Sequence, residues 1–151
     1  MTISSKVYKR RLLKLADFLD ELPKERFDYR EWVDNNWNGK LDISCNSKAC
    51  AFGWASTIKS FRKLGLRLMK TQNFGYGYIC LAKEDGTTYG DEFVAGRVIF
   101  GLTEEETSFL FIPNHPYDLD DGNELCSPSD EATPKQVAKH IRKFVKFKYG
   151  K

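Results

Sequence analysis

The sequence has no apolar run long enough to cross a membrane. Runs such as Phe109 to Ile112 fall far short of the roughly 18 to 20 apolar residues that span a bilayer. The first residues carry positive charge, but no apolar block follows them, so they do not match a secretory signal. We therefore expect a cytoplasmic protein without a membrane partner, in which the four cysteines are reduced thiols.

The chain also lacks the paired Cys-x2-Cys spacing of most small zinc sites. Cys45 and Cys50 are separated by four residues, and the chain has only two histidines. We expect neither a metal nor another cofactor. A thiol near a helix N-terminus is more easily deprotonated, so Cys50 with His115 or His140 as its base defines one enzymatic alternative, a cysteine hydrolase.

Negatively charged residues are missing from both ends of the chain. The net charge is +3, yet residues 1–14 hold five bases and no acids, and residues 135–151 hold seven bases and no acids. Residues 91–131 hold eleven acids and a single base, Arg97. The basic ends suit phosphate groups, whereas the acidic middle would repel a long polyanion. This pattern favours a small anionic ligand over nucleic acid.

Helical periodicity and capping signals predict six helices. Tyr8, Leu12 and Leu15 begin an apolar stripe in the first of them, and Pro23 ends that stretch. Capping boxes are expected at Thr103 and Thr133, and a variant of the same pattern at Asp28. Gly101 is expected to end the helix over residues 91–100. The expected ranges are 5–22, 28–33, 48–64, 91–100, 103–111 and 133–147.

Alternating residues after the predicted helix 48–64 indicate a small antiparallel sheet. Residues 66–68 and 76–80 alternate with period two, and Asp85-Gly86 marks a hairpin turn that leads into residues 87–89. Residues 113–133 are expected to form a long surface loop. Because 151 residues suffice for one core, we predict a single α+β domain over residues 1–151, mainly helical, with five or six helices and two or three strands.

The predicted helix 48–64 is expected to lie at the centre of the fold. Ser47 is a suitable N-cap, and Cys50 shares its apolar stripe with Trp54, which indicates a structural role for this thiol. Small residues beside bulky ones, with Gly53 in the middle, predict that another backbone crosses closely at this point.

A candidate ligand site combines this helix with the tyrosines of the hairpin. Ser47 and Lys48 would supply N–H groups and charge at the helix N-terminus. Tyr76 and Tyr78 lie on one face of an alternating strand, and Arg97 would be a second clamp for a phosphate. The alternative is that the tyrosines cover the core and that Arg97 pairs with Asp91 or Glu92.

Three motifs resemble a family of small uncharacterised proteins of bacteriophages and prophages. They are Cys45-Asn-Ser-Lys-Ala-Cys50-Ala-Phe-Gly-Trp-Ala55, Phe100-Gly-Leu-Thr-Glu-Glu-Glu106 and Ala132-Thr-Pro-Lys-Gln-Val-Ala-Lys-His-Ile141. Where that family commonly has Gly after the first cysteine, this chain has Asn46. The resemblance implies a phage origin, and it implies no activity or catalytic residue.

These observations favour a binding protein over an enzyme. The expected function is that of a phage accessory protein, in the host cytoplasm, that binds a nucleotide-like host signal or a host protein and so counteracts a host defence. The cysteine hydrolase with Cys50 is one alternative. The other is a nucleic-acid-binding protein that uses the basic helices near the two ends of the chain.

Overall fold

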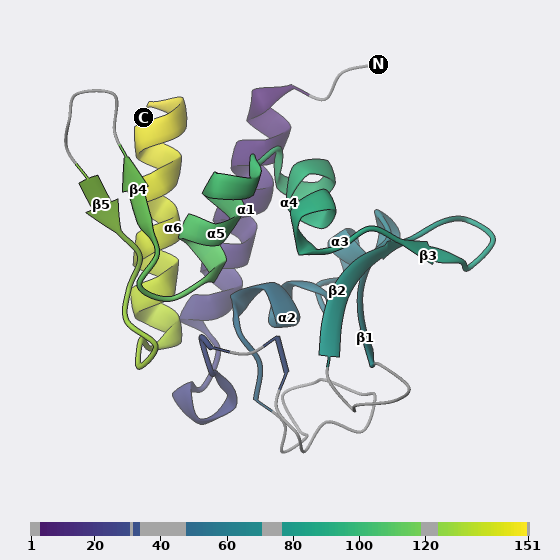
Figure 1. The fold of residues 1–151 in the computed structure, drawn as a ribbon, viewed down its shortest axis with the longest axis horizontal. Coiled ribbons are helices and arrows are strands. Elements are labelled where there is room, and N and C mark those ends of the chain that lie inside the picture. The colour runs from purple at the N-terminus through teal and green to yellow at the C-terminus, as the bar shows by residue number, and fades with distance from the viewer. Residues whose placement is uncertain (1–3, 31, 34–47, 71–76, 119–123, 151) are drawn as a thin grey trace.

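The computed structural model describes residues 4–30, 32–33, 48–70, 77–118 and 124–150. In these residues six α-helices accompany a three-stranded antiparallel sheet and a separate two-stranded hairpin (Figure 1). This confirms the predicted α+β class. None of the helices described here combines the length and the apolarity that a membrane crossing requires.

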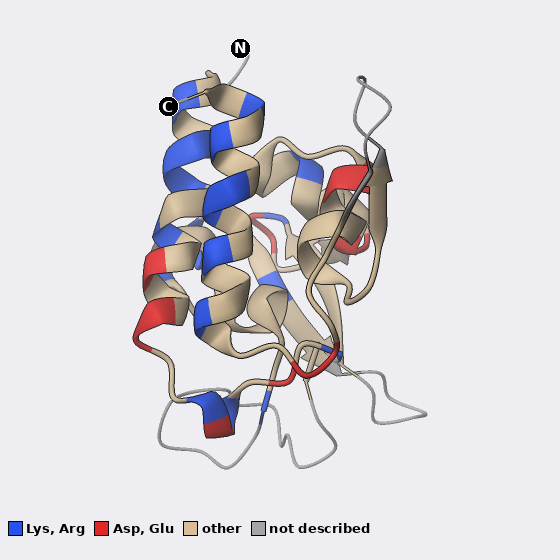
Figure 2. Cartoon of the chain, turned by 90° about the vertical axis from the view of Figure 1, so that its left-hand side faces the viewer, with Lys and Arg blue, Asp and Glu red and all other residues tan. Residues whose placement is uncertain are grey.

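Helices α1 (Ser5–Asp20) and α6 (Pro134–Tyr149) lie side by side and antiparallel (Figures 1 and 2). Both bury one apolar stripe and expose the opposite face, as the periodicity predicts. The predicted capping box of α6 is present, because Thr133 Oγ1 accepts from Gln136 N and Gln136 Oε1 accepts from Thr133 N. The buried residues of the pair are Leu12, Leu15, Ala16, Leu19, Pro134, Val137, Ala138, Ile141, Phe144 and Val145.

The predicted helix 48–64 is wrong as a single element. The structure contains two short helices, α2 (Ala51–Ala55) with Cys50 at its N-cap and α3 (Lys59–Lys63) with Ile58 at its N-cap. Two hydroxyl groups interrupt the helix between them: Ser56 Oγ donates to Gly53 O at 2.6 Å and Thr57 Oγ1 donates to Trp54 O at 2.7 Å. Such local bonds compete with helix propagation. Ser47, the predicted N-cap, lies outside the described residues.

The predicted close crossing at Gly53 is confirmed. A Cβ atom added at Gly53 would overlap the backbone oxygen of Trp32 and would lie 2.9 Å from the Ala49 Cβ. Trp54 and Phe52 on either side are fully buried. Phe52 lies at the centre of an aromatic cluster, with its ring centroid 4.5 Å from Phe111.

The helix predicted over residues 28–33 is also wrong. The preceding segment forms a short 3-10 helix, η1 (Lys24–Arg26), and Asp28 then begins a turn in which its Oδ1 accepts from Arg30 N at 3.0 Å. Asp28 N also donates to Ala49 O at 3.0 Å, in a parallel bridge between Phe27 and Ala49. This bridge keeps the backbone extended where the capping signal predicts a helix.

The sheet agrees with the predicted alternation. Strand β1 (Leu66–Lys70) pairs with β2 (Gly77–Ala82), and β2 pairs with β3 (Thr88–Tyr89), all antiparallel. Helix α4 (Glu92–Phe100) packs against β2. Its N-cap is Asp91, and it ends at Gly101 in the left-handed conformation, as predicted.

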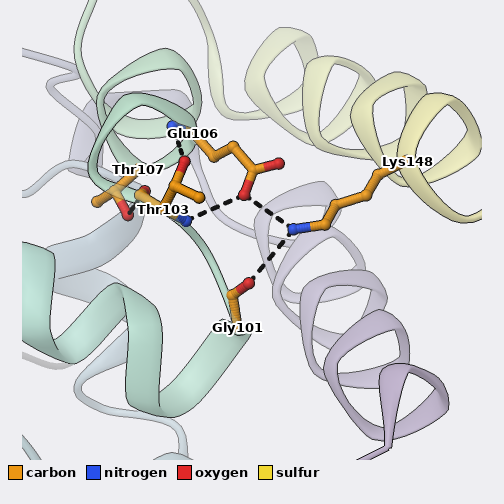
Figure 3. Close-up of polar contacts among 5 residues, drawn as sticks. All are labelled: Gly101, Thr103, Glu106, Thr107 and Lys148. Atoms are coloured by element: carbon orange, nitrogen blue, oxygen red, sulfur yellow. Dashed lines mark hydrogen bonds and ion pairs between the residues drawn. The ribbon is translucent and has the colours of Figure 1, made fainter.

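Helix α5 (Glu104–Phe111) begins with the predicted capping box of Thr103 and Glu106. Figure 3 shows that this box also joins α6: Glu106 Oε1 accepts from Thr103 N at 3.0 Å and from Lys148 Nζ at 2.8 Å. Lys148 Nζ also donates to Gly101 O at 3.3 Å. One lysine therefore ties the last turn of α6 to the junction between α4 and α5.

The predicted loop over residues 113–133 is partly wrong, because it contains a hairpin. Strand β4 (Pro116–Asp118) pairs antiparallel with β5 (Glu124–Cys126) beside α6 (Figure 1). The buried Ser127 closes the base of the hairpin, since its Oγ accepts from His115 N at 2.7 Å and donates to Ile112 O at 2.6 Å.

Candidate functional site

A strongly basic surface lies over α1 and α6. Figure 2 shows blue residues along the outer faces of both helices. We define the basic surface by its seven exposed cations, which are Lys6, Arg10, Lys14, Lys135, Lys139, Lys143 and Lys146.

The amphipathic pattern of the two helices produces this surface. Each helix buries its apolar stripe, so its long cationic side chains extend into solvent from the opposite face. Together α1 and α6 contain eleven bases and two acids, a net charge of +9 with His neutral. Because the whole chain carries +3, all remaining residues together carry −6. Folding therefore concentrates the positive charge on one face.

The two acids of α1 are already paired. Arg142 donates to Asp17 Oδ1 at 2.8 Å and to Asp20 Oδ2 at 2.6 Å. The hydrogen bond from Arg142 lowers the pKa of Asp20, and the same bonds raise the pKa of Arg142. Within the described part of the chain, no ion pair involves any of the seven cations of the basic surface. Direct ion pairs of the described residues thus do not neutralise their charge, although Lys135 helps to lower the pKa of Asp20 through its charge.

The acids of residues 91–131 lie on other elements. In Figure 2 the red residues of α4 and α5 are separated from the α1 and α6 pair. Glu106 is nearly buried and already bound to Lys148, and Asp91 caps α4 by accepting from Phe93 N and Val94 N. The segregation of charge weakens the repulsion that the sequence predicts between a polyanion and the acidic segment.

The residues of the predicted ligand site lie on separate elements. Lys48 is exposed before α2, Tyr78 is half-buried in β2 opposite Met69, and Arg97 is exposed on α4. No contact among those that the structure describes joins these three side chains. Ser47 and Tyr76 lie outside the described residues.

Lys48 does line a small open pocket of about 290 Å³. Its charged neighbours there are Arg30, which pairs with Asp28 at 3.2 Å, and the acids Asp130 and Glu131. These carboxylates disfavour an anionic ligand at this position. The predicted alternative pairing of Arg97 with Asp91 or Glu92 is not among the ion pairs of the described chain.

The chemistry of a cysteine hydrolase at Cys50 conflicts with its surroundings. The Cys50 side chain is fully buried, and burial raises the pKa of its thiol to about 12. His140, one of the candidate bases, is engaged with Phe109 O, 2.8 Å from its Nε2, and burial lowers its pKa. A thiolate at neutral pH is therefore strongly disfavoured. The predicted structural role of Cys50 agrees with this burial.

Metal-ligating side chains do not cluster in the described parts of the structure, where no three His, Cys, Asp or Glu residues come together. Counting charge by segment could identify the basic helices but not their contact, because α1 and α6 are more than a hundred residues apart.

Comparison with known proteins found no family model, no curated protein and no solved structure that matches this chain.

Proposed function

We propose that this protein binds nucleic acid through the phosphate backbone, using the basic surface of α1 and α6. The supporting observation is the segregation of charge, with +9 on two adjacent helices and −6 on the rest of the chain. Exposed cations without a direct ion pair attract a polyanion by releasing its counterions.

The dimensions and the residue types suit a duplex. Each helix has 16 residues and is therefore about 24 Å long, which corresponds to about seven base-pair steps of 3.4 Å. Six of the seven cations are lysines, which act as point charges, whereas bidentate recognition of a base edge typically uses arginine. We therefore expect binding with little sequence preference. If the chain is phage-encoded, as its motifs imply, the nucleic acid would be that of the phage or its host.

Fluorescence anisotropy with a labelled duplex of about 20 base pairs, longer than either helix, tests the proposal at several salt concentrations. The test variant is Lys139→Gln, Lys143→Gln, Lys146→Gln. Because each lost phosphate contact lowers the slope of log K against log salt by about 0.9, we expect the slope to fall by about 2 to 3 and the affinity at low salt to fall at least about tenfold.

The matched control is Lys59→Gln, Lys63→Gln, Lys83→Gln, which removes the same charge from exposed lysines on α3 and after β2. We expect this variant to bind nearly as well as the unchanged protein. Equal weakening by the two triple variants would show that net charge alone drives the interaction. Absence of binding to DNA or RNA duplexes at low salt would refute the proposal and favour an acidic protein as the partner.

A further inference from the structure

A groove lies between strand β5 and helix α6, at the base of the hairpin. It has a polar chamber of about 440 Å³ and an adjoining apolar pocket of about 100 Å³. The two parts share Cys126, His140 and Lys143, and together we call them the hairpin groove. The polar chamber is further lined by Pro128, Ser129, Ala132, Gln136 and Lys139, and the apolar pocket by Phe109, Phe144 and Phe147.

The walls of the hairpin groove are held by packing and hydrogen bonds. The Tyr117 ring of β4 packs on Phe109 with centroids 4.9 Å apart and meets the edge of Phe144 at 6.4 Å. On the other side of the hairpin base, Asn114 N donates to Pro128 O at 2.9 Å. Figure 1 shows the hairpin running along α6. The groove is therefore formed by two elements fixed to the core.

The polar chamber carries positive charge only. Its lining contains the ammonium groups of Lys139 and Lys143 and no carboxylate. Burial lowers the pKa of His140, so this ring is neutral at pH 7 and the charge comes from the two lysines. Gln136 uses its Oε1 to accept from Thr133 N, which leaves its amide N–H groups as donors. Such a lining is complementary to a carboxylate or a phosphate.

The apolar pocket offers aromatic surface at the other end. Phe147 is 53% exposed, an unusual position for a large apolar side chain, and its ring meets Tyr117 at 6.3 Å. The pocket of about 100 Å³ is smaller than the cavity of about 150 Å³ that accepts benzene, but it shares Cys126, His140 and Lys143 with the larger chamber. A small ring or a short aliphatic group could lie against Phe147 without entering the core.

We propose that the hairpin groove binds a small amphipathic anion. Its carboxylate or phosphate lies between Lys139 and Lys143, and its aromatic or short aliphatic end lies against Phe147. The volume of the polar chamber, about 440 Å³, falls within the range of about 300 to 1,000 Å³ that ligand pockets occupy. The site shares Lys139 and Lys143 with the basic surface, but it also requires Phe147 and a ligand with an apolar end, so Phe147→Ala distinguishes groove binding from duplex binding.

Cys126 makes the site measurable, because its exposed thiol lines both parts of the groove. The probe is phenyl phosphate, with inorganic phosphate and phenol as its two separated halves. Peptide mass spectrometry follows the rate at which iodoacetamide alkylates Cys126 in the full chain. We expect phenyl phosphate to slow this rate at a concentration at least about tenfold lower than either half requires.

The variants Lys143→Gln and Phe147→Ala should each weaken this protection at least about fivefold, a difference that corresponds to one lost contact. Lys146→Gln is the matched control, since Lys146 is an exposed lysine on the same helix that does not line the groove. All three positions are exposed, so circular dichroism should show folded proteins. Protection by phenol alone equal to that by phenyl phosphate, equal loss in Lys146→Gln and Lys143→Gln, or no protection by any probe would each overturn the proposal.

Discussion

Replacing Lys148 by Met should destabilise the fold, because it removes the cation that Glu106 needs. The Lys148 ammonium lies 2.8 Å from Glu106 Oε1 and 3.3 Å from Gly101 O (Figure 3). The Glu106 side chain is only 9% exposed, so water cannot replace the lost partner fully. Met keeps most of the apolar stem of Lys148 and removes its ammonium group, which also lies 5.9 Å from the ring centroid of Phe144 and 5.7 Å from that of Tyr149.

The expected loss of unfolding free energy is about 2 kcal/mol. Removing one partner of a fully buried ion pair costs about 3 to 5 kcal/mol. Here the loss is smaller, because the Lys148 side chain is 26% exposed and Glu106 keeps its hydrogen bond from Thr103 N. Hydrogen bonds to charged groups contribute about 1.5 to 3 kcal/mol, and each kcal/mol shifts the melting temperature of such a domain by roughly 2 to 4 °C. We therefore expect a decrease of about 4 to 8 °C.

Urea denaturation and calorimetry of a double-mutant cycle measure this interaction directly. Glu106→Gln is the second variant, because Gln at this position can still complete the capping box with Thr103. Lys146→Met is the matched control, since Lys146 is exposed on the same helix and its loss should change stability by less than about 0.5 kcal/mol. Equal stability of Lys148→Met and Lys146→Met, or a coupling energy near zero between residues 106 and 148, would refute the reasoning.

Three further predictions concern the core and the contact between the helices. Gly53→Ala should lower the unfolding free energy by about 2 to 3 kcal/mol in urea titrations, because its methyl group would overlap a backbone oxygen. Alkylation of Cys50 should require unfolding of the protein. Burial raises the pKa of the Cys50 thiol to about 12, so the contribution of Cys50 to stability should be complete below the ordinary thiol pKa of about 8.5. This contribution should decline as the pH rises above that value. Arg142 lowers the pKa of Asp20, so the stabilising contribution of Asp20 should be present above about pH 4 and be lost as the pH falls further. Arg142→Gln should raise this pKa in an NMR titration.

The elements that could be predicted from the sequence are those with local signals. The capping boxes at Thr103 and Thr133 and the left-handed stop at Gly101 depend on a few adjacent residues, and all three are confirmed. The helix predicted at Asp28 is wrong because a distant strand-like bridge to Ala49 holds the backbone extended. Tertiary contacts of this kind leave no local pattern.

The candidate surfaces depend even more on contacts between distant segments. Charge counting identifies two basic segments, but only the fold places α1 beside α6 and brings Glu106 of α5 into contact with Lys148 of α6. The hairpin groove could not be predicted from the sequence, because strands β4 and β5 have only three residues each, too few for an alternating pattern. One wall of the groove, formed by Cys126, Pro128, Ser129 and Ala132, comes from a region that the sequence predicts as a loop.

Gly101 has a consequence for how the protein would respond to mechanical force. A Cβ atom there would meet the ring of Tyr8 in α1, Arg11 Nη1 donates to the neighbouring Ile99 O at 2.9 Å, and Lys148 of α6 donates to Gly101 O. The first turns of α1 and the last turns of α6 are thus both attached to the end of α4, at the end of the helix pair where both chain ends emerge (Figure 1). A force that pulls the two chain ends apart would act on this junction before α1 could separate from α6 turn by turn. The force needed to break the contacts at Gly101 would therefore set the force at which the domain begins to unfold.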